Sequence, residues 1–314
     1  MTQLNPKKII MIPYAYLSGA NTGVNLGDKT RQIDIYMKNC CVSCISARCH
    51  NDTDTDVALV TNIDIPAKYK DLLIDRGVKI IRQDFDMFNF GGSYTWALAF
   101  YKLCALYHMA HNHEYRYIAY LDSDVYVQNS FKDIWKECDA HILLYDINHG
   151  LQVDNYQYIL SEMHAFDSGG GGDFPTHYGG EFFAANQDDA KIFANSCIDI
   201  FSQMRKCDFV TTYGDEFITS LAAKRMTDRI KNAGAYVYRF WTGRFRLIST
   251  CYEYNPVVVL HVPAEKERGM IKLFDKYIWK GKYPSRRKVY RLMHLSHRSL
   301  RTIIAQLIYT IKNR

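Results

Sequence analysis

Short apolar runs alternate along this sequence with longer segments in which apolar residues recur at helical spacing. Strands that alternate with helices are joined by crossover connections, so the pattern predicts a parallel sheet whose ligands bind at the carboxyl ends of the strands. The expected strands are Ile9–Tyr16, Asp56–Asn62, Val78–Gln83, Tyr115–Val127, His141–Asp146 and Gly179–Ala185, and the expected helices are Thr30–Arg48, Ala67–Arg76, Tyr94–His111, Phe131–Glu137, Gln187–Met204 and Glu216–Lys224.

The chain has 314 residues, of which 48% are hydrophobic, so it can bury one large core or two modest ones. We find no internal repeat and no linker between independent domains. The stretch from Asn148 to His177 predicts an irregular segment. Its glycine run, Gly169–Gly172, is not typical of a phosphate loop because no Gly-Lys-Ser/Thr follows and no helix starts on it. A flap or active-site loop is the better interpretation.

Nine cysteines at irregular spacing do not form a disulfide pattern, and a reducing cytoplasm fits them better. Cys40, Cys41, Cys44 and Cys49 with His50 are compatible with a zinc site. The same segment has a helical pattern, and no second Cys/His pair follows at a finger-like distance. A helix is therefore favoured over a zinc finger.

Lys7 and Lys8 precede an apolar run and resemble the start of an export signal. Pro13 and the tyrosines after it end that run early, so a first core strand is expected instead. No run of about 18 apolar residues is present, and we expect no membrane span.

The positive charge is concentrated at the C-terminus. The chain carries a net charge of +6, whereas Lys276–Arg314 alone contains eleven Lys or Arg and no acid, which leaves the rest at −5. A basic amphipathic helix of this kind can lie on an anionic membrane, or it can dock on the protein's own core. Nucleic acid is not expected as a partner, since no binding motif is present. The apolar residues with helical spacing are Leu292, Leu295, Leu300, Ile303, Ile304, Leu307, Ile308 and Ile311.

The chemically most informative motif is Asp122-Ser123-Asp124, directly after the apolar run Tyr117–Leu121. Two carboxylates two residues apart at a strand exit point to the same side. Such a pair can hold Mn²⁺ or Mg²⁺ together with a diphosphate, for example that of a nucleotide-sugar. The alternative is a turn in which an aspartate only caps the strand end.

Five segments occur in the order in which retaining GT-A glycosyltransferases place their motifs. Tyr117–Val127 resembles the strand and D-x-D of family 8, and Tyr101-Lys102-Leu103 is similar to its Tyr-Arg-Leu. Tyr178–Phe183 resembles the Gly-Gly-Phe-Phe segment of family 6, and Tyr213–Phe217 its His-Asp-Glu-Ser. His261–Lys266 is similar to the family 8 His-x5-Lys, although the lysine arrives one residue early. The resemblance spans residues 7 to 270.

This resemblance implies a GT-A fold, a Rossmann-like mixed sheet flanked by helices, over residues 1–275, followed by the basic amphipathic tail 276–314. It implies a metal site formed by Asp122, Asp124 and His261. A histidine beside an apolar run is otherwise often a buried structural residue, so both interpretations of His261 stay open.

The donor is expected to contact residues at several strand ends, and the nucleotide base to lie at the end of the first strand. Lys102 could reach the D-x-D motif, or remain solvated on its helix. The implied cofactor-binding residues are Pro13, Tyr14, Ala15, Lys102, Asp122, Ser123, Gly179, Gly180, Glu181, Lys266 and Arg268.

The reacting carboxylate is expected at the start of the helix that begins near Glu216. Asp215 and Glu216 could simply cap that helix, since its dipole favours acids there. Family 6 places a glutamate here beneath the anomeric carbon, which implies that Glu216 stabilises an oxocarbenium ion or acts as a transient nucleophile, with retention. An inverting enzyme would use Asp215 or Glu181 as a general base.

Together these features predict a metal-dependent hexosyltransferase with Mn²⁺ or Mg²⁺ and a UDP-hexose such as UDP-galactose, UDP-glucose or an N-acetyl form. The acceptor is expected to be a bacterial surface glycan, lipopolysaccharide or capsule. It would be modified in the cytoplasm at the inner face of the cell membrane. A sugar-phosphate nucleotidyltransferase is a second hypothesis, although Ser18–Gly23 lacks a basic glycine-rich loop. A non-catalytic nucleotide-sugar-binding protein is a third.

Overall fold

The computed structural model describes residues 8–18, 31–91, 94–148, 154–167, 176–240, 242, 257–295, 300, 304, 307, 308 and 311. The strands are β1 (Lys8–Tyr14), β2 (Thr55–Thr61), β3 (Lys79–Arg82), β4 (Tyr117–Leu121), β5 (Val125–Val127), β6 (Ile142–Asp146), β7 (Tyr178–Asn186), β8 (Ile230–Asn232), β9 (Val237–Arg239) and β10 (Val259–His261). The helices are α1 (Gln32–His50), α2 (Ala67–Asp75), α3 (Tyr101–Asn112), α4 (Lys132–Glu137), α5 (Asp154–Phe166), α6 (Gln187–Lys206), α7 (Asp215–Arg225), α9 (Gly269–Leu273) and α10 (Arg286–Leu292).

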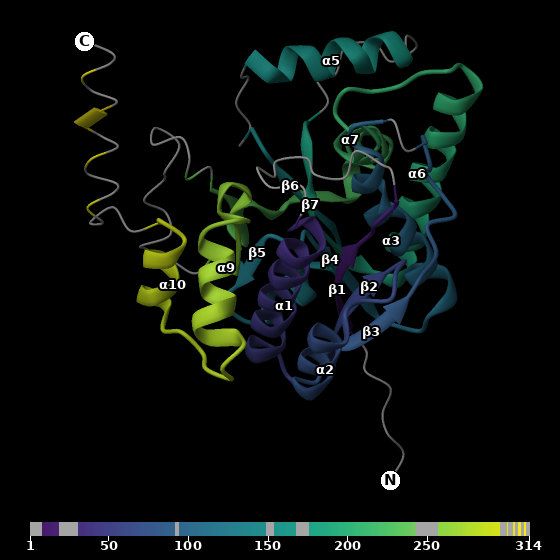
Figure 1. Ribbon diagram of the computed structural model, residues 1–314. Helices are drawn as coiled ribbons and strands as arrows, with labels where there is room; N and C mark the ends of the chain where they lie inside the picture. The colour runs from purple at the N-terminus through teal and green to yellow at the C-terminus, as the bar shows by residue number, and fades with distance from the viewer. Residues whose placement is uncertain are drawn as a thin grey trace.

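The main sheet has seven strands in the order β3-β2-β1-β4-β7-β6-β8 (Figure 1). Neighbouring strands from β3 to β4 are parallel, as the alternating pattern predicts, whereas β7 is antiparallel to both β4 and β6. A second, three-stranded sheet has the order β5-β10-β9. The architecture is therefore a mixed sheet rather than the purely parallel one that alternation alone suggests.

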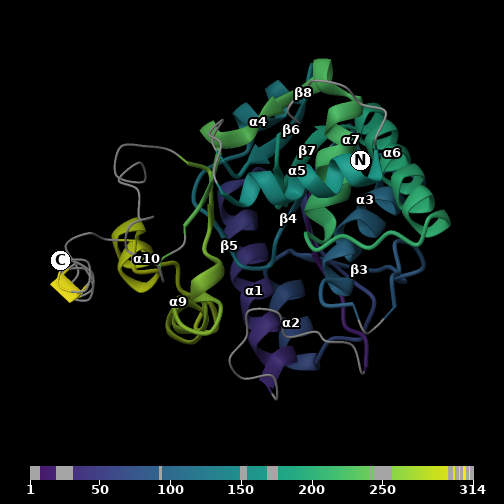
Figure 2. The same cartoon turned by 90° about the horizontal axis from the view of Figure 1, so that it is seen from above.

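Helices cover both faces of the main sheet, because its strands are apolar on both sides (Figure 2). In β1, Ile10 and Ile12 pack in one core cluster with α1. Ile9 and Met11 pack in a second cluster with α3 and α6. The cysteines of α1 confirm the helical interpretation: Cys40, Cys41 and Cys44 are fully buried, and they are free, like the other described cysteines.

The segment predicted as one strand, Tyr115–Val127, is two strands in different sheets. β4 ends at Leu121 and pairs with β1 and β7, whereas β5 begins at Val125 and pairs with β10. The prediction was wrong because an apolar and β-branched composition reports burial and does not record which sheet a strand joins. Both strands are buried, and only the polar turn Asp122-Ser123-Asp124 between them marks the change of sheet.

The segment predicted to be irregular, Asn148–His177, contains the helix α5. In Figure 1, α5 lies over the edge of the sheet where β6 ends and β7 begins. Glu162 of α5 accepts hydrogen bonds from Thr211 and Thr212, which come just before α7. The glycine run at Gly169–Gly172 lies outside the described residues.

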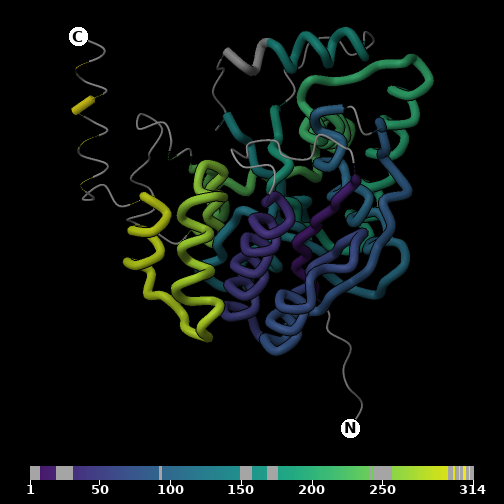
Figure 3. The backbone as a smooth tube through the Cα atoms, in the orientation of Figure 1, coloured from purple at the N-terminus to yellow at the C-terminus, as the bar shows by residue number. Residues whose placement is uncertain are grey.

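The C-terminal part of the chain packs beside α1. The tube drawing shows α1, α9 and α10 side by side (Figure 3). Val289, Met293 and Leu295 are fully buried in the core cluster that contains α1. By contrast, the described helical residues farther on expose their apolar side chains, with Leu300 72% and Ile311 74% exposed. Within the part that the structure describes, no helix is both long and apolar enough to cross a membrane.

Candidate active site

Asp122, Ser123 and Asp124 form the turn that connects the two sheets. The hydroxyl oxygen of Ser43 in α1 lies 2.6 Å from the carbonyl oxygen of Ser123, which fixes the turn from behind. On the other side, Val262 donates a backbone hydrogen bond of 3.0 Å to Asp124. These contacts hold the three residues of the motif in place, although they do not belong to a strand.

The Asp–Asp–His group comprises Asp122, Asp124 and His261, and one ligand atom from each lies within 4.8 Å of the others. His261 ends β10, which pairs with β5, so the strand that follows the motif also brings the histidine to it. Its Nε2 lies 3.4 Å from Asp124 Oδ2 and 3.8 Å from Asp122 Oδ2. The predicted ligands therefore converge, although nearly 140 residues separate His261 from the motif.

A divalent cation fits this group. Two carboxylates and one imidazole are ligands that Mn²⁺ accepts. Asp124 Oδ2 is buried and, within the described residues, has no hydrogen-bond partner, only ion pairs with His261 and Lys266 at 3.4 and 3.3 Å. Burial alone would raise the pKa of Asp124, but Lys266 and His261 outweigh it and lower that pKa below its usual range.

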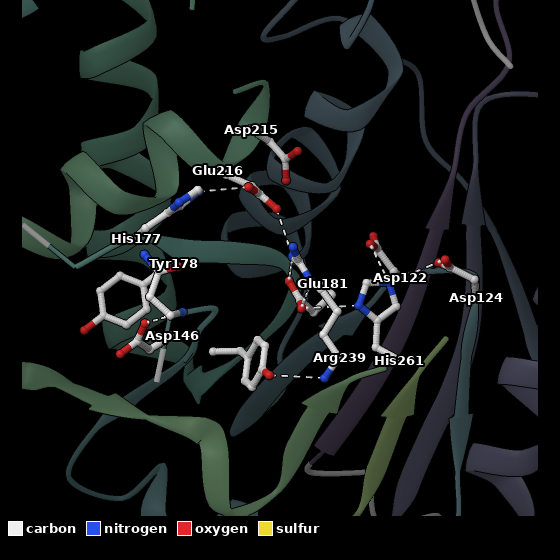
Figure 4. A network of polar contacts seen from close by, with 12 residues as sticks. Asp122, Asp124, Asp146, His177, Tyr178, Glu181, Asp215, Glu216, Arg239 and His261 are labelled. Carbon is white, nitrogen blue, oxygen red and sulfur yellow. Dashed lines mark hydrogen bonds and ion pairs between the residues drawn. The ribbon is translucent and has the colours of Figure 1, made fainter. Parts of the chain in front are cut away.

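Glu181 lies directly behind His261 (Figure 4). Its Oε1 is 3.2 Å from His261 Nδ1, and its side chain is fully buried. Burial would lower the pKa of His261, but Asp124 and Glu181 together raise it to about 9. With Nδ1 held by Glu181, Nε2 faces the two aspartates. This is the carboxylate–histidine arrangement that orients metal ligands in proteins.

Arg239 of β9 connects Glu181 to Glu216 (Figure 4). Its Nε lies 2.6 Å from Glu181 Oε1, and its Nη2 lies 2.9 Å from Glu216 Oε1. Burial disfavours the charged guanidinium, but the two carboxylates outweigh this and raise the pKa of Arg239. The backbone N–H of Arg239 also donates to the Tyr145 hydroxyl, which anchors the arginine in the cluster.

Glu216 is the second residue of α7 and remains 22% exposed, unlike its buried neighbours Asp215 and Phe217. His177 Nε2 lies 2.9 Å from Glu216 Oε2, so each carboxylate oxygen has a cationic or hydrogen-bonding partner. Burial raises the pKa of Glu216, but Arg239 and His177 outweigh it and lower that pKa to about 2. The carboxylate is held in a single orientation with one part open to solvent.

Lys102 of α3 lies between Asp122 and Asp215. Its Nζ is 2.9 Å from Asp122 Oδ1 and 3.0 Å from Asp215 Oδ2, and the side chain is largely buried. The alternative of a solvated Lys102 is therefore wrong for this structure. Burial, together with the charges of Asp122 and Glu216, raises the pKa of Asp215 to about 6, and Lys102 limits the rise.

Two glycines at the start of β7 leave room for these charged groups. A Cβ on Gly180 would lie 2.0 Å from Asp215 Oδ2 and 2.8 Å from Lys102 Nζ. A Cβ on Gly179 would lie 1.9 Å from Glu181 Oε2. β7 is antiparallel to β4, with Phe182 opposite Leu121, so its first residues meet the exit of β4. The reversed strand thus brings the glycine motif to the D-x-D motif.

The residues expected around the nucleotide base lie at the end of β1. Pro13, Tyr14 and Ala15 are buried, and the rings of Tyr14 and Tyr36 are 5.6 Å apart. Lys266 Nζ lies 5.6 Å from the centre of the Tyr36 ring and 3.3 Å from Asp124 Oδ2, so Lys266 connects the two tyrosines to the D-x-D motif.

The remaining expected site residues are Ser123 and Arg268. Ser123 contributes its carbonyl oxygen to the turn, whereas the side chain of Arg268 is exposed.

Sequence reasoning missed Arg239 and His177. Arg239 follows Val237 and Tyr238 and precedes Phe240, and a charged residue inside an apolar and aromatic run is a sign of a buried ion pair. His177 directly precedes the glycine motif, but nothing in its immediate sequence marks it as a partner of Glu216.

Comparisons with known proteins agree with this architecture. The chain is similar to the crystal structure of mouse xyloside xylosyltransferase 1 in its apo form, with a TM-score of 0.52 at 12% sequence identity, over 81% of this chain and 96% of that one. It is also similar to an active-site mutant of LgtC, with a TM-score of 0.49 at 14% identity, over 81% and 86% of the two chains. No family model and no curated protein sequence matches it significantly. The xylosyltransferase likeness and the mixed sheet confirm the predicted GT-A fold class.

Proposed function

We propose that this protein is a metal-dependent glycosyltransferase that moves a hexose from a nucleotide-sugar, a UDP-hexose, to a glycan acceptor with retention of configuration. The observation that supports it most is the convergence of the Asp–Asp–His group and Glu216 on one cluster at the carboxyl edge of the sheet. The fold similarity to a xylosyltransferase supports the same class of reaction.

In this proposal Asp122, Asp124 and His261 hold Mn²⁺ or Mg²⁺, and Glu181 positions His261 through Nδ1. The bound cation supplies positive charge that stabilises the diphosphate leaving group. Lys266, beside Asp124, contributes a second positive charge on the same side. Tyr14 and the end of β1 bind the nucleotide base.

Glu216 faces the anomeric carbon and stabilises the positive charge that develops on the sugar when its bond to the diphosphate breaks. Arg239 and His177 hold the carboxylate in position, which limits the reorganisation needed during the reaction. Asp215 is buried against Lys102, and we assign it a supporting role in orienting that lysine between the sugar and Asp122.

A thermal-shift screen of UDP-, GDP-, CMP- and dTDP-sugars, with and without Mn²⁺, tests the proposal. A UDP-sugar is expected to raise the melting temperature only when Mn²⁺ is present, because ligands that bind the native state stabilise it by mass action. Asp133→Asn, at an exposed ion pair, is the matched control and should respond like the wild type. An equal shift in EDTA would contradict the metal assignment.

Product analysis separates the competing enzyme classes. A glycosyltransferase with Mn²⁺ and UDP-hexose releases UDP slowly by transfer to water, whereas a nucleotidyltransferase forms UTP and sugar 1-phosphate when pyrophosphate is added. Formation of UTP would replace the proposed function by the second hypothesis. Tight binding without any turnover would favour a non-catalytic binding protein.

The acceptor in our proposal is a bacterial surface glycan, lipopolysaccharide or capsule, presented at the inner face of the cell membrane. The exposed apolar residues Leu300, Ile304, Leu307, Ile308 and Ile311 follow one another at helical steps, and they support docking on a lipid surface. Arg287, Lys288 and Arg291 of the preceding helix are exposed and add positive charge for anionic headgroups.

Sedimentation with phosphatidylethanolamine vesicles, with and without phosphatidylglycerol, tests this docking. Leu307→Glu combined with Ile311→Glu should release the protein from anionic vesicles, whereas Lys280→Glu, outside the apolar series, should weaken binding less. A deletion should begin after Leu295, because Val289, Met293 and Leu295 belong to the core. Unchanged sedimentation of the double variant would remove the membrane from the proposal.

A further inference from the structure

A second group of potential metal ligands lies between α3 and the loop after β3. Asp86, Cys104 and His108 each offer one ligand atom, and these atoms all lie within 4.8 Å of one another. Cys104 and His108 are one helical turn apart and share a face of α3. Asp86 comes from the loop after β3. We name these three residues the Asp–Cys–His group.

The distances fit a small tetrahedral ion. Zinc bonds to sulfur, nitrogen and oxygen of ~2.0–2.3 Å place neighbouring ligand atoms ~3.3–3.6 Å apart. Here Cys104 Sγ lies 3.4 Å from Asp86 Oδ1, and His108 Nε2 lies 2.8 Å from the same oxygen. An ion would have to widen the second separation to ~3.3 Å, and the third pair, Cys104 Sγ and the His108 ring nitrogen, lies within 4.8 Å. Thiolate, imidazole and carboxylate are the three protein ligands that zinc prefers.

The surroundings provide a fourth ligand and a partner for the histidine. The side chain of Asp86 is 52% exposed, which leaves room for a water molecule, whereas Cys104 is fully buried. His108 Nδ1 lies 3.2 Å from Asn112 Nδ2. Rotation of the Asn112 amide by half a turn presents its oxygen to Nδ1–H, as a histidine bound to metal through Nε2 requires.

We propose that Asp86, Cys104 and His108 bind a zinc ion that ties the loop after β3 to α3. Binding exchanges the thiol proton of Cys104 for the ion and releases that proton to solvent. Without an ion, the thiol directs its proton toward the backbone oxygen of Asp84 and the carboxylate of Asp86, and zinc must displace that proton. Zinc affinity should therefore fall as the pH is lowered.

The site has a structural role with a link to the proposed active site. α3 also carries Lys102, which contacts Asp122. An ion at this site would therefore stabilise the helix that positions Lys102. The inference does not depend on the proposed reaction.

Cobalt titration of the reduced, EDTA-treated protein tests the site, because only a thiolate ligand gives an intense near-ultraviolet charge-transfer band with Co²⁺. In Asp124→Asn, which disables the competing Asp–Asp–His group, we expect this band to saturate at one equivalent and to disappear when Zn²⁺ is added. Asp124→Asn should retain the band, since the Asp–Asp–His group contains no thiol. Cys207→Ser, at an exposed cysteine, is the matched control and should also retain it.

Cys104→Ser should abolish the band, and His108→Gln should weaken cobalt binding by more than about 10-fold. His108 lies near the surface, so this second variant keeps the test valid if Cys104→Ser does not fold. Zn²⁺ should raise the melting temperature of Asp124→Asn but not of the double variant Asp124→Asn/His108→Gln, because the intact Asp–Asp–His group of His108→Gln could itself bind Zn²⁺. No charge-transfer band in the wild type, or a band that persists in Cys104→Ser, would overturn the proposal.

Discussion

The Asp–Asp–His and Asp–Cys–His groups differ in what surrounds them. In the first, His261 and Asp124 are buried, and behind them the buried Glu181 and the largely buried Arg239 form a charged support. In the second, the Asn112 amide lies against Nδ1 of the histidine, and the carboxylate of Asp86 is half exposed. The first has two hard oxygen ligands, whereas the second has one oxygen and one sulfur.

This difference indicates different tasks. Supporting residues that are buried and charged hold ligands in one geometry, as chemistry at a bound diphosphate requires. A thiol and an imidazole one turn apart on a helix need little support to hold an ion that only links two segments. The variants below are ordered by expected effect, and the Asp–Cys–His group, which none of them changes, serves as reference.

Asp124→Ala should have the largest effect. The variant removes a buried carboxylate oxygen that forms ion pairs with His261 and Lys266. We expect Mn²⁺ affinity to fall by more than about 100-fold, because loss of a metal ligand should cost more than loss of a residue that only orients one. Hydrolysis of a bound donor should fall below detection. Titration of free Mn²⁺ by electron paramagnetic resonance measures the affinity, and Asp133→Ala serves as control. If Asp124→Ala also abolished the cobalt–thiolate band, the two groups would not be independent.

Glu216→Gln should lower turnover about 100- to 1000-fold, the range seen when one electrostatic stabiliser is removed from an active site. Mn²⁺ affinity and the donor-induced thermal shift should remain, because Glu216 does not contact the Asp–Asp–His group directly. Steady-state kinetics and the thermal shift are measured together. Unchanged turnover with intact donor binding would remove Glu216 from the mechanism.

Glu181→Gln should weaken Mn²⁺ binding about 10- to 100-fold, because an amide holds His261 less firmly than a carboxylate. The matched control is Glu265→Gln. Glu265 is also buried and accepts from a histidine, His294, at 2.9 Å, and neither residue belongs to the Asp–Asp–His group. Equal losses in both variants would mean that the effect reflects stability alone and that Glu181 does not position a ligand.

Gly180→Ala should cost about 1 kcal/mol of unfolding free energy, at the low end for overpacking, because the new Cβ meets the ends of the Lys102 and Asp215 side chains. Urea denaturation measures the change. Gly234→Ala is the control, since its nearest contact is the Asn232 side chain at 3.3 Å. If Gly180→Ala proves as stable as the wild type, these two charged groups are less tightly packed than we infer.

Much of the fold could be predicted from local patterns. The first strand, expected at Ile9–Tyr16, is β1 at Lys8–Tyr14, and the helix expected from Gln187 is α6, which begins there with Asn186 as its cap. Apolar periodicity and capping act over a few residues, so they are visible in the sequence. α5 was missed because it belongs to a segment whose other residues lack such periodicity.

The candidate site was predictable where a motif marked it. Asp122, Asp124 and Glu216 stand in recognisable surroundings, and the structure brings all three into one cluster with His261 and Lys102. Arg239 and His177 were missed, because their importance lies in what they contact across the sheet. Whether the expected site residues have the assigned roles stays a prediction that the variants above test.

By itself, the sequence determined which segments are apolar enough to form strands and helices, and where oxygen, nitrogen and sulfur ligands occur along the chain. Only the tertiary structure decided which of them meet. The antiparallel insertion of β7 and the pairing of β10 with β5 bring Glu181 and His261 to Asp122 and Asp124. Strand pairing between distant segments depends on the free energy of the whole fold, and no local pattern records it.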